Sequence, residues 1–187
     1  MSPDVSSRVQ YSTNGNLAIL LFHDVEVLDF CGPFEVFSVA NKKSEREVFS
    51  VFTVAESSTP VLAFNGLSIN PRYTLDNCPN VDILVVPGGI GTRKEIENRV
   101  ILDWIQSIGV RAELVLSVCT GALLLGKAGM LDGLEATTHQ VGLELLAEIA
   151  PTAILHRERR FVDNGKVVTS AGIAAGIDMS LHIVERL

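Results

Sequence analysis

Residues 112–126 read AELVLSVCTGALLLG, and this stretch decides the fold. An apolar run over 112–118 ends directly in Cys119, and small and apolar residues follow from Gly121. The first run predicts a buried strand and the second predicts a helix. Cys119 then lies on a tight strand-to-helix turn, which is the geometry of a nucleophile elbow. Because a helix N-terminus attracts negative charge, the position predicts that Cys119 favours the thiolate over the thiol.

Two more apolar runs of the same kind lie upstream, at 17–22 and 81–86. Continuous apolar runs are typical of strands that are buried on both faces of a parallel sheet. Helical patterns are expected between and after these runs, over 32–40, 100–108, 121–128 and about 174–187. Alternating strands and helices predict an open α/β sheet with right-handed crossovers and helices on both faces.

Shorter β signals lie between these elements. Residues 47–54 are rich in β-branched and aromatic side chains and predict a further strand. In 57–68, Pro60 and Asn65-Gly66 predict a turn between short extended pieces. The pair Asn164-Gly165 predicts a tight hairpin turn within 160–169, because both residues tolerate positive φ angles.

Three candidate functional features follow the three long strands. Asp29 comes after the first strand, Gly88-Gly89 after the second and Cys119 after the third. In open α/β sheets, ligands bind at the carboxyl ends of the strands. The sequence therefore predicts that all three features meet at one edge of the sheet.

The composition bounds the class of protein. The chain has 187 residues, 47% of them hydrophobic, and we expect one domain over 17–187 after a flexible tail over 1–16. A net charge of −7 argues against a nucleic-acid partner for this domain. No apolar run is long enough to span a membrane. Three widely spaced cysteines indicate a reducing, cytoplasmic setting and predict no metal site, and the phosphate-binding glycine motifs are absent.

Each candidate residue has a plainer alternative. Cys119 is a reactive thiol or a buried structural cysteine. Asp29 is a proton carrier beside the thiol or a helix N-cap with Pro33 in the first turn, and the two roles are compatible. Gly88-Gly89 is an ordinary turn or a source of N–H donors for an oxyanion. His139 is a helix cap or a core residue.

Five motifs, taken in order, resemble those of the ThiJ/PfpI superfamily, whose members are class I glutamine amidotransferase-like. They are LDFCGP (28–33), PGG (87–89), SVCTG (117–121), ATTH (136–139) and GIAAGID (172–178). Within the superfamily the chain is most similar to isocyanide (isonitrile) hydratases and to the ligand-sensing halves of AraC-type regulators. The resemblance extends from Leu17 to Leu187.

The resemblance implies a flavodoxin-like three-layer α/β/α sandwich with a mostly parallel sheet, a homodimer and no cofactor. It implies that Cys119 is the nucleophile and that Asp29 is hydrogen-bonded to it. The backbones of Gly89 and Thr120 are the implied oxyanion donors. The further residues implied around the pocket are Gly88, Ile90, His139, Gly172 and Ile173.

Two residues depart from the family pattern, and they bear on the type of activity and on the substrate pocket. Thr120 stands where protease members carry His after the cysteine, which disfavours peptidase activity. Gln140 stands where hydratase-like members usually carry Trp, so the shape of the substrate pocket differs from theirs.

The leading hypothesis is a hydro-lyase that adds water to an isocyanide, a small-molecule substrate, and gives an N-substituted formamide through Cys119. Two alternatives stay open. One is a ligand-sensing domain of the AraC-regulator type, and the other is a redox or carbonyl-stress protein acting through Cys119.

Overall fold

The computed structural model describes residues 15–43 and 48–187. The predicted tail over 1–16 lies mostly outside these residues, but Gly15 and Asn16 already belong to the first strand, where they pair with Phe49 and Ser50. The start of the predicted strand at Glu47 also lies outside the described residues.

A seven-stranded sheet forms the centre, in the order β10-β11-β7-β6-β1-β2-β5. Every neighbouring pair is parallel except the β10–β11 hairpin. Its strands are β1 (Gly15–Leu21), β2 (Phe49–Ala55), β5 (Tyr73–Thr74), β6 (Ile83–Val86), β7 (Leu114–Val118), β10 (Phe161–Asp163) and β11 (Val167–Ser170). The predicted mostly parallel α/β sheet is confirmed.

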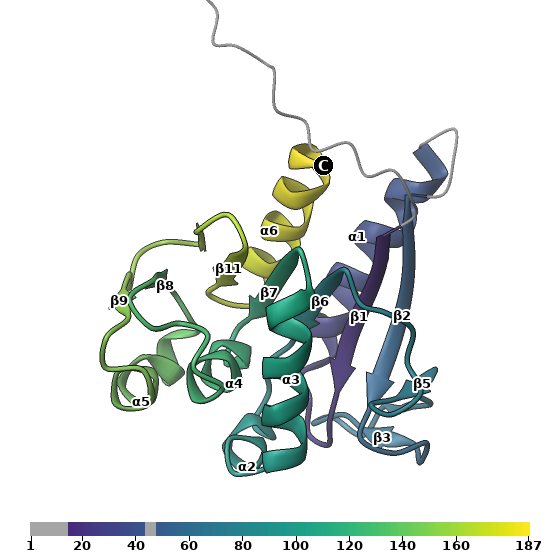
Figure 1. Cartoon of the computed structure of the whole chain (residues 1–187), viewed down its shortest axis with the longest axis horizontal. Coiled ribbons are helices and arrows are strands. Elements are labelled where there is room, and N and C mark those ends of the chain that lie inside the picture. Colours follow the sequence, from purple (N-terminus) through teal and green to yellow (C-terminus); the bar gives the residue numbers. More distant parts are fainter. Residues whose placement is uncertain (1–14, 44–47) are drawn as a thin grey trace, which may run out of the picture.

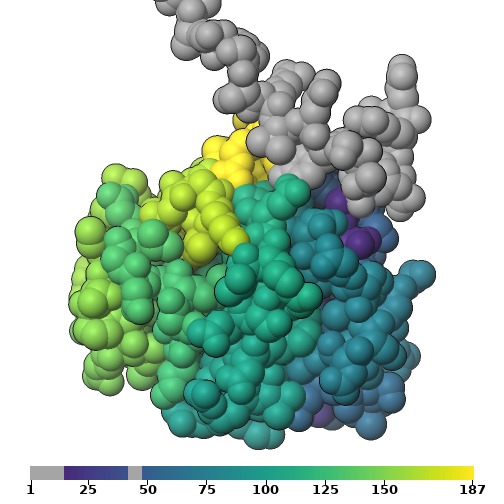
Figure 2. Space-filling view, in the orientation of Figure 1, coloured from purple at the N-terminus to yellow at the C-terminus, as the bar shows by residue number. Residues whose placement is uncertain are grey.

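Helices cover both faces of this sheet (Figure 1). On one face α1 (Val27–Lys43) packs against α6 (Ile173–Arg186), and on the other α3 (Arg99–Arg111) packs against α4 (Gly121–Lys127). Residues of α3 cover the middle of the face seen in Figure 2. The short helices are α2 (Thr92–Glu95), η1 (Gln140–Gly142) and α5 (Leu143–Ile149).

The central strands lie in the middle of the core, as their continuous apolar runs predict. All five residues of β7 and all four of β6 are buried. Two small sheets lie outside the main one: β3 (Val61–Leu62) with β4 (Ser68–Ile69), and β8 (Glu135–Ala136) with β9 (Ile154–Leu155). The β3–β4 pair is antiparallel with Gly66 at φ +88° between the strands, which confirms the turn predicted there.

The predicted hairpin forms, but its turn is shifted by one residue. Asn164 pairs with Val167, so the turn is centred on Gly165-Lys166, and only Gly165 has a positive φ, +85°. The Asn164 side chain has another role, since it bonds the backbone N–H and C=O of Glu135 and ties the hairpin to β8.

Candidate active site

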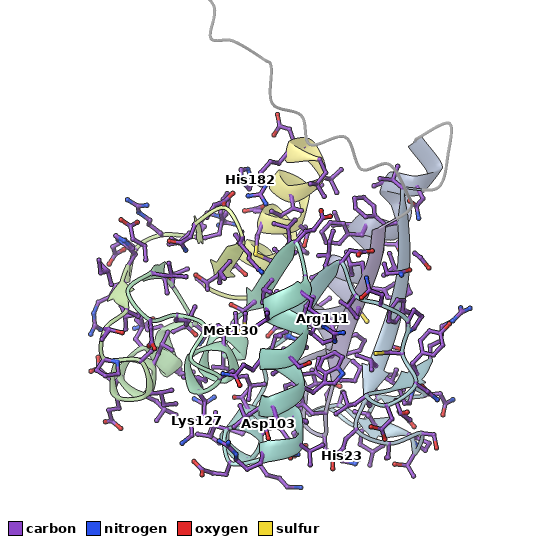
Figure 3. The ribbon with its side chains drawn as sticks, viewed as in Figure 1. His23, Asp103, Arg111, Lys127, Met130 and His182 are labelled. Carbon is purple, nitrogen blue, oxygen red and sulfur yellow. The ribbon has the colours of Figure 1, made fainter. Side chains whose placement is uncertain are left out.

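The three candidate features meet at one edge of the sheet, as predicted. β7, β6 and β1 are adjacent and parallel, so their carboxyl ends point the same way. Asp29 lies in the first turn of α1 after β1, Gly88-Gly89 follow β6, and Cys119 follows β7. In Figure 3 this edge is the lower end of the molecule, marked by His23 just after β1.

Cys119 has a strained backbone, with φ +56° in a non-glycine residue. Two contacts hold this conformation. The Cys119 N–H donates to the Ser170 carbonyl over 3.0 Å, and the Thr138 hydroxyl donates to the Cys119 carbonyl over 2.7 Å. The predicted tight turn is therefore present, and it is fixed from both sides by neighbouring segments.

Glycines allow the ends of β6 and β7 to approach each other here. A Cβ on Gly88 would lie 2.6 Å from the Thr120 nitrogen and 2.8 Å from the Cys119 Cβ. A Cβ on Gly121 would collide with the carbonyl oxygen of Val86. Gly88 and Gly121 are thus needed for close approach, which places the Cys119 turn directly against the backbone after β6.

Asp29 is completely buried, and neither carboxyl oxygen has a hydrogen-bond partner among residues 15–43 and 48–187. The pKa of Asp29 is raised to about 7, chiefly by burial and also by the charge of Glu26, against the lowering effect of the Cys119 thiol and the Gly88 N–H. The capping alternative is wrong, because α1 begins at Val27 and the carboxyl group caps nothing. Pro33 lies inside the helix and not in its first turn.

The Cys119 thiol is half-buried, and its pKa does not fall as expected. Burial, as the largest cause, and the charge of Asp29 together raise the pKa of Cys119 to about 12. The Thr120 N–H and hydroxyl lower it, but by less. This direction is opposite to the predicted thiolate preference, because burial and the charge of Asp29 outweigh the donors of Thr120.

Asp29 and Cys119 are electrostatic neighbours, since each shifts the pKa of the other. The contact is close enough for the thiol to lower the pKa of Asp29 and for Asp29 to raise that of Cys119, but the carboxyl oxygens do not meet strict hydrogen-bond geometry, so the hydrogen bond implied by the resemblance stays a prediction. Two adjacent negative charges in a desolvated site repel each other. Over a wide pH range the pair consequently holds one proton between them.

Thr120 connects the elbow to the glycine pair. The Gly89 N–H donates to the Thr120 Oγ1 over 3.0 Å, so it is already engaged in this structure, and its role as an oxyanion donor stays a prediction. The buried Thr92 Oγ1 lies 2.8 Å from the Gly89 carbonyl oxygen and 3.2 Å from the Thr120 Oγ1. The Thr120 N–H, which faces the sulfur, is the other expected donor.

The other predicted residues lie on segments that flank the elbow. His139 caps η1 by accepting the Val141 N–H over 3.3 Å, which confirms the capping alternative. A Cβ on Gly172 would lie 3.1 Å from the His139 ring, so the two residues are neighbours. Ile90 and Ile173 are 55% and 40% exposed.

Sequence reasoning missed two threonines at this site. Thr138 holds the elbow through the Cys119 carbonyl, and Thr92 supports Gly89 and Thr120. Thr138 lies within the ATTH motif, which could have identified it. No motif in the sequence marks Thr92 as a site residue, since its role depends on the way α2 folds back onto the turn after β6.

Neither a metal-binding group nor a membrane-spanning helix occurs among the described residues. They include no group of three or more His, Cys, Asp or Glu side chains placed to hold a metal ion. None of the helices formed by residues 15–43 and 48–187 combines the length and apolarity that a membrane crossing requires.

Comparison with known proteins places this site in a family context. Residues 16–186 match the model of the DJ-1/PfpI family. An isonitrile hydratase from Pseudomonas putida is 37% identical over 91% of this chain and 71% of its own length. The transcriptional regulator GbdR from Pseudomonas aeruginosa is 29% identical over 91% of this chain but only 46% of its own length.

Solved structures agree with this result. A ThiJ/PfpI family protein from Pseudomonas syringae superimposes with a TM-score of 0.83 at 30% identity, covering all of this chain and 76% of the other. An AraC family regulator from Pseudomonas putida superimposes with a TM-score of 0.78 at 21% identity, covering 92% of both chains, which shows a shared fold.

Proposed function

This chain belongs to the DJ-1/PfpI family, and from that premise we propose that it is a cofactor-independent hydro-lyase acting on isocyanides. It adds water to the isocyanide and releases an N-substituted formamide. One observation carries the proposal. A completely buried carboxyl group without a hydrogen-bond partner among the described residues, Asp29, neighbours the half-buried thiol of Cys119 on a positive-φ turn. The similarity to an isonitrile hydratase supports the choice of reaction.

In the proposed first step, the Cys119 sulfur bonds to the terminal carbon of the isocyanide. Asp29 takes the thiol proton and delivers it to the same carbon, which gives a covalent thioimidate, R–N=CH–S–Cys119. A pKa of about 7 suits Asp29 to this exchange near neutral pH, because the group then accepts and returns a proton with little cost.

In the second step, water adds to the thioimidate carbon while Asp29 takes a proton from the water and passes one to the nitrogen. The carbon–sulfur bond then breaks, the sulfur regains its proton, and R–NH–CHO leaves. The Thr120 N–H is the proposed donor that stabilises negative charge near the sulfur. One water is consumed and no oxidant or reductant is needed.

The test is the hydration of p-nitrophenyl isocyanide by the purified protein, followed by the appearance of the formamide. We expect Cys119→Ala to lose the activity. Cys78→Ala is the matched control, because Cys78 contacts the Leu75 carbonyl in another part of the molecule. Absence of formamide with the unmodified protein, or full activity in Cys119→Ala, would overturn the proposal.

A second candidate is a ligand-sensing domain that binds a small molecule without turnover. The raised pKa of Cys119 favours it, because burial keeps the sulfur in the less nucleophilic thiol form. The regulator similarity over 91% of this chain supports it too. Isocyanide binding by calorimetry without formamide release would replace the hydratase proposal with this one.

The redox alternative has less support. Cysteine oxidation follows thiolate character, and burial raises the pKa of Cys119. Mass spectrometry after mild peroxide treatment tests it, and selective sulfinic acid at Cys119 over Cys31 and Cys78 would restore it. We also propose a homodimer, which light scattering of the purified protein would check.

A further inference from the structure

Arg93 lies in α2, next to the threonine that supports the glycine turn. Its guanidinium donates to the Thr92 Oγ1 over 3.3 Å and to the Val141 carbonyl over 3.4 Å. Thr92 is completely buried, whereas Arg93 is partly exposed. The guanidinium is thus held between two segments that are 48 residues apart in the sequence.

Both of these segments reach the surroundings of Cys119. On one side, the Thr92 hydroxyl lies 3.2 Å from that of Thr120, the residue after the thiol. On the other side, the Val141 N–H donates to the His139 ring. Arg93 is thus linked to the residue after the thiol through two hydroxyl groups, those of Thr92 and Thr120.

The charge of Arg93 is not neutralised within the described part of the chain. No carboxylate among residues 15–43 and 48–187 forms an ion pair with it, whereas Arg157, Arg160 and Arg186 each pair with an acidic side chain. Its two bonds go to neutral oxygens and use two of its five N–H groups. The guanidinium keeps donors and a full positive charge for an anion.

Arg93 is also not the counter-ion of the Asp29–Cys119 pair. The charge that shifts the pKa of Asp29 is that of Glu26, and the charge that shifts the pKa of Cys119 is that of Asp29. A guanidinium that bonds to Thr92 and Val141, on two segments that flank the thiol, suits the recognition of a group on the substrate that is distant from the reacting carbon.

We infer that Arg93 is a specificity-determining residue that binds a carboxylate on the substrate, so that the preferred isocyanide carries a carboxylate at the end opposite the reacting carbon. The reaction in this inference rests on the proposed function. The carboxylate on the substrate is inferred from the geometry of Arg93. A planar carboxylate accepts two parallel N–H bonds from a guanidinium, a geometry that no neutral ester reproduces.

The test compares 4-isocyanobenzoate with its methyl ester. We expect kcat/KM of the unmodified protein to be about 10-fold to 100-fold higher for the acid, the range typical of hydrogen bonds to charged groups. Arg93→Gln should abolish this preference, chiefly through KM, and leave the ester within about twofold of its original rate. Lys94→Gln is the matched control, since it removes the same charge from the neighbouring exposed residue of α2.

Two results would overturn the inference. One is equal kcat/KM for acid and ester in the unmodified protein. The other is an equal loss on both substrates in Arg93→Gln, which would show that the bond to Val141 is only structural. The first result does not depend on the variant being folded.

A binding measurement separates this inference from the proposed reaction. Calorimetry of the unmodified protein with 4-formamidobenzoate and its methyl ester needs no turnover. Binding of the acid that is at least 10-fold tighter and depends on Arg93 supports the carboxylate site even if no isocyanide is hydrated. Hydration of both isocyanides without Arg93-dependent binding would keep the reaction and reject the carboxylate site.

Discussion

Two aspartates lie at opposite ends of the molecule, and their surroundings are opposite as well. Asp29, at the carboxyl edge of the sheet, is buried without a partner among the described residues. Asp163, near His182 at the other end (Figure 3), accepts bonds from His182, Arg186 and the Gly165 N–H. The pKa of Asp29 is raised to about 7, chiefly by burial. Although burial also opposes the charge of Asp163, the His182 and Gly165 hydrogen bonds and the Arg186 charge lower its pKa.

The difference between the two aspartates is the number of hydrogen-bond donors around each carboxyl group. A carboxyl group with full hydrogen bonding is stabilised as the anion and resists protonation. A buried carboxyl group without partners is poised to gain or lose a proton, and it costs stability when charged. Asp163 fastens the end of α6 to the β10–β11 hairpin, while Asp29 neighbours a thiol.

The largest expected effect comes from Asp29→Asn on catalysis. The amide cannot carry the proton between Cys119 and the substrate, so we expect isocyanide hydration to fall by about 10²-fold to 10⁴-fold. Glu35→Gln, on an exposed position of the same helix, is the control and should keep its activity. Steady-state kinetics with p-nitrophenyl isocyanide measure both. Equal activity in the two variants would remove Asp29 from the mechanism.

The next effect is on stability as a function of pH, and its sign differs between the two aspartates. The folded pKa of Asp29 is raised from 3.8, so its contribution is fully present below about pH 4 and is lost as the pH rises through about 7. Relative to Asp29→Asn, the unmodified protein should lose at most about 4.5 kcal/mol of unfolding free energy across this window, because one pKa unit corresponds to about 1.4 kcal/mol.

Asp163 should show the reverse. Its folded pKa lies below 3.8, so its contribution is present above about pH 4 and is lost as the pH falls through the folded pKa. Urea unfolding of the unmodified protein, Asp29→Asn and Asp163→Asn between about pH 3 and 8 checks both signs. Parallel curves for the two variants would contradict the contrast.

A smaller effect is expected for Asp163→Asn at neutral pH. Removing the charged acceptor should cost about 1–2 kcal/mol of unfolding free energy, a modest value because the side chain is partly exposed. Asp103→Asn is the control, since the exposed Arg99–Asp103 pair on α3 should contribute less than about 0.5 kcal/mol. Isocyanide hydration should stay unchanged in both. A larger loss in Asp103→Asn would contradict the assignment of Asp163 as a structural anchor.

The sequence predicted where the site lies better than it predicted its electrostatics. Continuous apolar runs identify the parallel strands. Asp29, Gly88-Gly89 and Cys119 follow the ends of these strands, so their meeting at one edge can be predicted without knowing how side chains pack. The start of α1 was misplaced, since Pro33 resembles a first-turn residue. Here Pro33 lies four residues after Asp29 inside the helix, where it lacks the N–H that would bond the Asp29 carbonyl.

Burial and packing explain why the sequence did not predict the pKa of Cys119 or the hydrogen bond of the Gly89 N–H. The pKa of Cys119 depends on how much solvent α1 and the β6 turn exclude, and residue order carries no direct measure of that. The bond of the Gly89 N–H was missed for a similar reason, because its acceptor is the Thr120 hydroxyl, one residue from the thiol. Local geometry is therefore readable from motifs, whereas competition among donors requires the packed structure.

In the proposed mechanism Asp29 carries a proton for Cys119 and does not make the thiol acidic. This role of Asp29 is tested most directly by the rate at which iodoacetamide alkylates Cys119 at pH 9, followed by mass spectrometry of its peptide in the unmodified protein and in Asp29→Asn. Because the carboxylate raises the pKa of Cys119, we predict faster alkylation in the variant, by up to about 10-fold, although the variant hydrates isocyanides poorly. Slower alkylation in Asp29→Asn would contradict the account, since it would mean that the carboxylate promotes the thiolate.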